Sequence, residues 1–179
     1  MRMISISSLA VALLVALCPA SSTRADDGQA LGDKPVQDPS SPKTYAGFYK
    51  IVSAERDGDP IPQERIASHV VRITQDMIVV LDAEENELYS CTYTLDLDAR
   101  PHRIDMKSTG GPSDAVGQTS RGIMTRGTNE NDEPFVMLCY NLIGDEYPEE
   151  FRTRAQSETN LFVLHPIPDP TEGKDDPSR

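Results

Sequence analysis

The sequence of 179 residues contains no tryptophan, only three cysteines and few basic residues. Lys and Arg number 17 against 29 Asp and Glu, so the formal net charge is −12. This acidity excludes a nucleic-acid-binding protein, because such proteins present basic surfaces to phosphate. Three cysteines are too few for a scaffold built on disulfides. Hydrophobic residues at 37% fit one soluble domain with polar extensions, not a membrane protein with several spans.

The sequence has one long apolar run, Leu9–Leu17, which follows the basic Arg2 and precedes the small-residue site Thr23-Arg24-Ala25. This order predicts a cleaved signal peptide over residues 1–25. The run is shorter than the ~20 residues of an uncleaved membrane anchor. Acylation at Cys18 would need a small residue before it, and Leu17 stands there. We therefore expect an exported protein, periplasmic or extracellular, with no membrane span after cleavage.

Two polar segments flank the part of the chain that is rich enough in apolar residues to fold. Residues 26–43 and 166–179 are rich in Pro, Asp and Ser, so we interpret them as a disordered linker and a disordered tail. Residues 44–165 then form one domain. Loss of the signal peptide brings the net charge to −14, of which about −10 lies on this domain. The acidity of the domain itself argues against anionic lipid surfaces as well as nucleic acid.

Short segments with β periodicity, separated by turn residues, fill residues 44–165. One short helix is predicted near 63–68. Such a series favours an all-β, eight-stranded antiparallel meander closed as a barrel, because closure removes exposed edges; a two-sheet sandwich is the alternative. The expected strands are Phe48–Ala54, His69–Thr74, Met77–Asp82, Glu87–Leu95, His102–Lys107, Gln118–Arg126, Pro134–Asn141 and Asn160–His165.

The same alternation predicts which side chains face the barrel interior. We expect a filled core, because eight strands enclose little more than their own side chains. The alternative is a small cavity in which tyrosine hydroxyls meet a ligand, with Tyr49, Tyr89, Tyr93 and Tyr140 as the candidate binding residues. The expected inward residues are Tyr49, Ile51, Val71, Ile73, Val79, Tyr89, Tyr93, Leu95, Ile104, Met106, Leu138, Tyr140 and Phe162.

Six short motifs lie in order over residues 44–165, and they are Gly47–Glu55 followed by Asp57-Gly58 and Pro60-Ile61-Pro62, Tyr93-x-Leu95-Asp96, Pro101-x-x-Ile104-Asp105, Gly122-Ile123, Leu138-Cys139-Tyr140 and Pro148-x-x-Phe151. Together they resemble the small lipocalin-like domains of unknown function that are abundant in Planctomycetes. The resemblance implies a lipocalin-like barrel, often secreted, and no catalytic residue set. The sequence departs from that family's pattern at Phe48, where a small residue is usual, at Tyr49, where tryptophan is common, and at Tyr147, where the last motif has arginine. Cys91 is not a position of the pattern.

The mature chain keeps two cysteines, Cys91 and Cys139. They fall on the fourth and seventh predicted strands, about 14 Å apart along the sheet at ~4.8 Å per strand. A disulfide needs Cα atoms within about 7 Å. We therefore expect two buried free thiols rather than a bond.

No motif identifies a metal, a cofactor or a catalytic site. The three histidines, His69, His102 and His165, lie at predicted strand ends with no zinc-like spacing. The acidic stretches 82–87 and 129–133 lack the spacing of calcium loops and are interpreted as solvated turns. We expect neither metal nor cofactor.

The favoured function is a non-catalytic binding or protein-interaction module. A carrier of a small apolar or amphipathic ligand is the second hypothesis, for which we expect a pocket of ~300 Å³ or more. The third is a hydrolase at the barrel mouth that uses the loop Asp145–Arg154 with Arg152 and Arg154, although no nucleophile is evident there.

Overall fold

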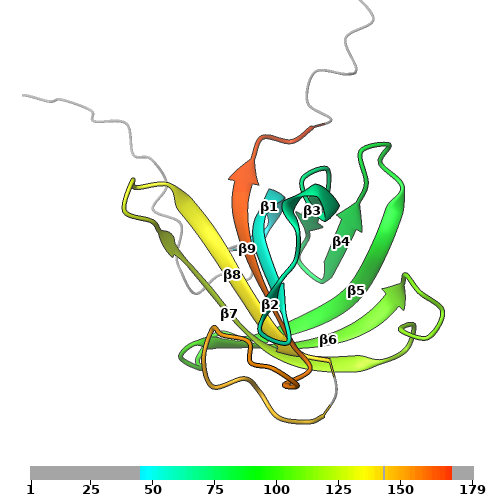
Figure 1. The fold of residues 1–179 in the computed structure, drawn as a ribbon, viewed down its shortest axis with the longest axis vertical. Helices are drawn as coiled ribbons and strands as arrows, with labels where there is room; N and C mark the ends of the chain where they lie inside the picture. The colour runs from blue at the N-terminus through cyan, green and yellow to red at the C-terminus, as the bar shows by residue number, and fades with distance from the viewer. Residues whose placement is uncertain (1–44, 143, 171–179) are drawn as a thin grey trace, which may run out of the picture. The chain divides into compact units, whose positions relative to one another are not determined.

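The computed structural model describes residues 45–142 and 144–170. The predicted signal peptide, the linker and residues 171–179 of the tail lie outside this part of the chain. Nine strands and a 3-10 helix, Gln63–Arg65, lie within it (Figure 1). The strands are β1 Gly47–Arg56, β2 Asp59–Pro60, β3 Val70–Ile73, β4 Met77–Leu81, β5 Glu87–Asp96, β6 His102–Gly110, β7 Thr119–Thr128, β8 Pro134–Asn141 and β9 Thr159–Ile167.

The strands form one antiparallel sheet that closes on itself. From β3 to β9 each strand pairs with the next along the chain, and β1 pairs with both β3 and β9. The closing pair runs from Phe48 opposite Ile167 to Arg56 opposite Asn160. The two-residue β2 pairs only with the end of β1 and is not part of the barrel wall. The predicted eight-stranded antiparallel barrel is confirmed, and its last strand continues two residues into the segment interpreted as the tail.

Alternation of side chains along each strand separates the interior from the outer surface. In β6, Ile104 and Met106 are buried, whereas Arg103, Asp105 and Lys107 are exposed. Twelve of the thirteen residues predicted to face inward belong to the interior core or pack against it.

Val79 is the exception among the predicted inward residues. It is buried but lies on the outer face with Arg72, while its neighbours Ile78 and Val80 line the interior. The expectation was wrong because Met77–Leu81 is apolar throughout, so its pattern does not reveal which residues face inward.

The two acidic turns are held by their own side chains. The Asp82 carboxylate accepts hydrogen bonds from the backbone N–H groups of Glu84 (2.9 Å) and Asn86 (2.8 Å). The pKa of Asp82 is lowered, first by the side-chain hydrogen bond from Asn86 and then by those backbone bonds. Asn129 accepts from two backbone N–H groups of its own turn in the same way. These oxygens therefore serve the turns.

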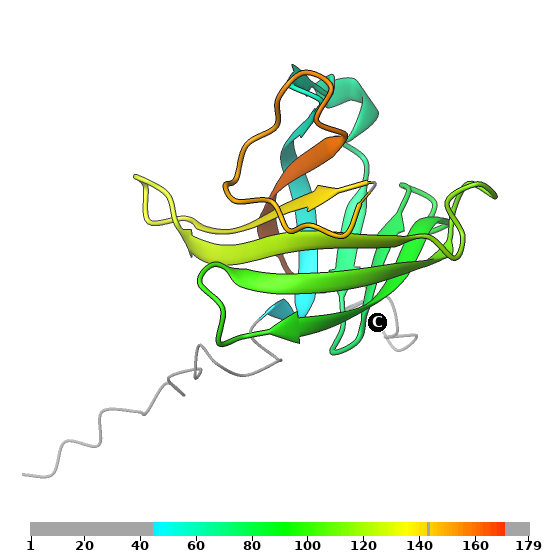
Figure 2. The same ribbon diagram turned by 90° about the horizontal axis from the view of Figure 1, so that it is seen from below.

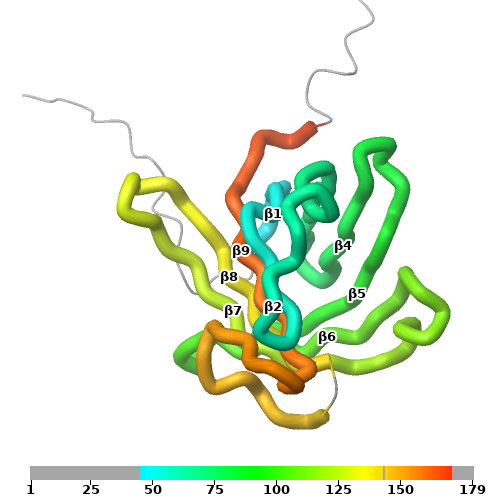
Figure 3. The backbone as a smooth tube through the Cα atoms, viewed as in Figure 1, coloured from blue at the N-terminus to red at the C-terminus, as the bar shows by residue number. Residues whose placement is uncertain are grey.

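The barrel has two distinct ends. The open end carries the connection between β1 and β3 (57–69) and the turn between β4 and β5 (82–86). Figure 3 shows the backbone of the first connection, in teal, running from β2 to the start of β3. The buried Ile66 of this connection packs on the interior core, with the partly buried Ile61 against it. The closed end carries Tyr45, two residues before β1, and the turns 74–76 and 97–101.

Tyr45 blocks the closed end. Its side chain is fully buried, and its hydroxyl lies 2.7 Å from Nδ1 of His102. The two rings pack edge to face, 5.9 Å apart. Burial lowers the pKa of His102, with further lowering by the Arg100 and Arg126 charges and an opposing effect of Asp96. Tyr45 is thereby anchored under the barrel.

A second, smaller cluster lies on the outside of the barrel. Ile123, Cys139 and Leu161 point outward from β7, β8 and β9. The connection between β8 and β9 covers them with Tyr147 and Phe151. Figure 2 shows this connection, in orange, where it leads into the start of β9.

Candidate ligand-binding cavity

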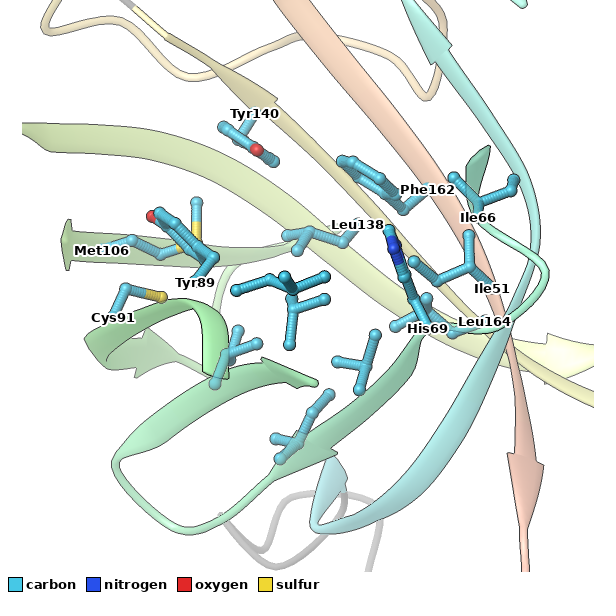
Figure 4. Close-up of a pocket in the computed structure, with 15 residues that line it drawn as sticks. Ile51, Ile66, His69, Tyr89, Cys91, Met106, Leu138, Tyr140, Phe162 and Leu164 are labelled. Carbon is cyan, nitrogen blue, oxygen red and sulfur yellow. The ribbon is translucent and has the colours of Figure 1, made fainter. Parts of the chain in front are cut away.

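The barrel interior contains a cavity of about 230 Å³ (Figure 4). Almost all of its wall is aliphatic or aromatic carbon. The lining residues are Ile51, Ile66, His69, Val71, Ile73, Ile78, Val80, Leu88, Tyr89, Cys91, Met106, Leu138, Tyr140, Phe162 and Leu164.

The cavity meets the surface at the open end. Leu88 lines it and is 38% exposed, one of two large hydrophobic side chains exposed to that degree in the described part of the chain. Ile66 and His69 line it from the connection between β1 and β3. In Figure 4 these two lie across the cavity from Tyr89 and Cys91. A ligand would therefore enter between this connection and the start of β5.

A β-bulge explains why Leu88 reaches the cavity. Leu81 pairs with Glu87 and Val80 with Tyr89, so Leu88 is an extra residue without a partner on β4. A bulge redirects the side chains of its strand. Simple alternation places Leu88 on the face opposite Tyr89, so the pattern of this segment does not predict Leu88 as a cavity residue.

Tyr89 and Cys91 supply neutral polar groups on one side of the cavity. The Tyr89 hydroxyl lies 2.7 Å from Oγ of Ser108, and either can donate. Burial raises the pKa of Tyr89, and the Ser108 hydrogen bond opposes that rise. Burial also raises the pKa of the Cys91 thiol to about 11. Both groups are uncharged at neutral pH and can exchange hydrogen bonds with an uncharged ligand.

Tyr140 closes the same side from β8. Its ring stacks on Phe162, with the centroids 6.2 Å apart and the planes 9° from parallel. Burial raises the pKa of Tyr140 well above its usual range, while a side-chain hydrogen bond with Asn160 acts in the opposite direction. The phenol is therefore neutral as well.

The four tyrosines proposed from the sequence separate into two pairs. Tyr89 and Tyr140 line the cavity, as that hypothesis requires. Tyr49 and Tyr93 do not line it. Each lies two residues nearer the closed end than a lining residue of its own strand, Ile51 on β1 and Cys91 on β5. The Tyr49 hydroxyl donates to the carbonyl of Tyr45 at 2.8 Å. The Tyr93 hydroxyl donates to the carbonyl of Thr74 at 2.6 Å, so both are already partnered.

The two cysteines lie on opposite faces of the barrel wall. Cys91 faces the cavity, whereas Cys139 belongs to the outer cluster. Both are free and buried. Burial raises the pKa of Cys139 to about 11, as it does for Cys91.

The loop proposed as a hydrolase site lies away from the cavity. Asp145–Arg154 contributes no lining residue, because Tyr147 and Phe151 fasten it to the outer cluster. Its carboxylate Glu150 is ion-paired with Arg152 at 2.7 Å and with Arg154. Hydrogen bonding from Arg152 is the main cause of the lowered pKa of Glu150. An exposed, paired carboxylate of this kind suits a surface salt bridge better than acid–base chemistry.

The histidines do not converge. His69 lies at the open end and His102 at the closed end, while His165 lies on β9 opposite Lys50. Within residues 45–142 and 144–170, no three His, Cys, Asp or Glu side chains are placed to hold a metal ion. The helices of this part include none that is long and apolar enough to cross a membrane.

The rim of the open end is acidic. Segments 57–69 and 82–87 together carry seven Asp and Glu and a single Arg, Arg65. The adjacent Arg56 of β1 lies 3.9 Å from the carboxylate of Asp57. A negative potential at the entrance favours neutral or positive ligands over anions.

Comparisons with known proteins add no relative. A scan against models of protein families found no match, and neither a search of curated proteins nor one of solved structures found a significant match. The function must therefore be argued from the site itself.

Proposed function

We propose that this domain is a binding module that holds a small, mainly apolar ligand in the barrel cavity. The cavity carries this proposal, because it is apolar, reaches the surface at one end and is blocked at the other. Its 230 Å³ is below the ~300 Å³ that drug-sized ligands occupy. It is larger than the ~150 Å³ engineered cavity that binds benzene. The size thus fits a small ligand.

A protein-interaction module is less well supported by the surface. Among the described residues, the large exposed hydrophobic side chains are Leu88 and Val116, on different segments. Leu88 belongs to the cavity entrance, and a single exposed valine is ordinary for a soluble protein. A hydrophobic docking surface would show a contiguous patch.

We also propose that the domain is non-catalytic, exported and related to the lipocalin-like family that its motifs resemble. The barrel with an apolar interior supports that relation. The pairing of Glu150 with Arg152 and Arg154 supports a structural role for the loop Asp145–Arg154. Export is supported by the sequence pattern of residues 1–25.

The binding energy comes mainly from removing apolar ligand surface from water. Each buried methylene contributes about 0.8 kcal/mol, so an eight-carbon alcohol gains about 6 kcal/mol. That corresponds to a Kd on the order of tens of micromolar. The Tyr89 and Tyr140 hydroxyls then select for a polar end on that side of the cavity.

Calorimetric titration of the mature protein with octan-1-ol tests this function. We expect saturable one-to-one binding with a negative heat-capacity change. Val80→Phe places a ring into the cavity and should abolish binding. Leu81→Phe is the matched control, because Leu81 follows on the same strand but faces outward, and it should bind normally. Absence of saturable binding, or equal binding by both variants, would overturn the proposal.

A further inference from the structure

The cavity occupies only part of the barrel length, because a packed layer of side chains fills the barrel directly below its lining residues. We call this layer the floor: Tyr49, Tyr93, Ile104 and Val136, all at most 6% exposed. Each floor residue lies two positions from a lining residue on its own strand, toward the closed end. Inward positions two residues apart are separated by about 7 Å along the strand, so the floor is the next layer down.

Hydrogen bonds fix the floor in place. Tyr93 donates to the carbonyl of Thr74 (2.6 Å), and Tyr49 donates to that of Tyr45 (2.8 Å). The buried Tyr45 lies beneath and is tied to His102. Breaking such a hydrogen bond leaves a buried hydroxyl and a buried carbonyl without a partner, which costs the desolvation free energy of both groups. Displacing the floor to make room for a longer ligand is therefore unfavourable.

The floor limits the size of the ligand. By proportion with the ~150 Å³ cavity that takes the six carbons of benzene, 230 Å³ takes roughly nine non-hydrogen atoms. A long acyl chain has about twice that number. Its excess would either remain in water at the entrance or displace buried tyrosines.

Resting on the proposed function, we infer that the ligand is a compact, uncharged molecule of about nine non-hydrogen atoms with one polar end. Tyr93 is the residue that sets this size limit. It lies directly below Cys91, which lines the cavity, and pairs across strands with Met106, another lining residue. The neutral hydroxyls of Tyr89 and Tyr140 can meet the polar end.

A series of linear alcohols from butan-1-ol to dodecan-1-ol tests the limit by calorimetric titration. Affinity should rise about fourfold per methylene while each carbon is buried. It should level off near octan-1-ol, because further carbons stay in water. An affinity that rises without a break to dodecan-1-ol would overturn the inference but leave the proposed function standing. If no alcohol binds, both fail.

Two variants assign the limit to Tyr93. Tyr93→Leu shortens the side chain and deepens the cavity, so the plateau should move to longer alcohols by about two to three carbons, given the volume that the ring vacates. Tyr93→Phe loses the same hydrogen bond to Thr74 but keeps the ring, so its plateau should stay at octan-1-ol. Circular dichroism verifies that both variants fold. A plateau at the same length in Tyr93→Leu would show that Tyr93 does not set the size.

If Tyr93→Leu fails to fold, Val136→Ala makes the same comparison at another floor position on β8. It removes two methyl-sized groups from the floor, and the plateau should lengthen by about one carbon. Val163→Ala, on the neighbouring β9, removes the same atoms from an outward position opposite Met137, and its plateau should not move. If the plateau moves in neither Val136→Ala nor Tyr93→Leu, the floor does not determine the size of the ligand.

Discussion

Gly122 of β7 offers a sharp test of how the wall is packed around Tyr140. A Cβ at this position would lie 2.6 Å from the carbonyl oxygen of Cys139 and 2.8 Å from Cβ of Tyr140. Neither atom is the free end of a flexible side chain, so β7 and β8 would have to move apart. Overpacking of this kind costs about 1–3 kcal/mol. Replacing a strand glycine by alanine returns about 0.5–1 kcal/mol, so Gly122→Ala should lose about 1–2 kcal/mol net.

Gly127 on the same strand is the matched control. The nearest atom to its added Cβ is the tip of the Phe135 ring at 3.1 Å, and that side chain can turn away. Gly127→Ala should therefore be neutral or slightly stabilising. Urea unfolding of the mature protein, followed by tyrosine fluorescence and circular dichroism, measures both variants against wild type.

The expected loss for Gly122→Ala lowers Tm by roughly 4–8 °C for a domain of this size. Ligand affinity should fall too, because the displaced Tyr140 belongs to the cavity wall. Equal unfolding midpoints for the two alanine variants would refute the reasoning, since they would mean that the backbone at Cys139 does not press on Gly122.

Three further predictions concern charge and access. The pKa of His102 is lower in the folded protein than in the unfolded chain, so as the pH falls the unfolded chain binds a proton before the folded protein does. The free energy of unfolding should therefore be highest above pH ~6.5 and decrease below it. His102→Gln should flatten urea midpoints between pH 7.5 and 5, and an unchanged slope would count against this. Cys139 is buried, so it should react slowly with thiol reagents. Phe151→Ala uncovers it and should speed its labelling by about tenfold or more, while Cys91 stays slow. Peptide mass spectrometry measures both thiols, and equal labelling of the two would contradict this prediction. Octanoate should bind more weakly than octan-1-ol, because the acidic rim repels its carboxylate. About 0.5 M NaCl screens this repulsion and should reduce the difference in affinity. A difference that does not change with salt would contradict a role of the rim and leave the cost of burying the carboxylate as the cause.

Much of the barrel could be predicted from local patterns. The segment Cys91–Asp96 alternates strictly, and so does His102–Lys107, because each has one face on the core and one in water. Asp and Asn at the turns mark where strands end, since their side chains bond the turn backbone. Where a strand was apolar on both faces, as at Val79, the pattern could not assign the inward side.

The cavity could be predicted only in part. Tyr89 and Tyr140 have the same residue type and inward parity as Tyr49 and Tyr93, and nothing local distinguishes the pairs. Leu88 reaches the entrance only because a bulge breaks the alternation of β5.

The sequence by itself determined where the barrel strands lie and most of their inward faces, because these depend on residues a few positions apart. Tertiary structure decided which inward residues meet. Pairing of β1 with β9 closed the sheet, and burial of Tyr45 blocked the closed end of the barrel. Depth along the barrel axis depends on contacts between residues distant in sequence, such as Tyr45 and His102, so only the folded chain separates the floor from the cavity.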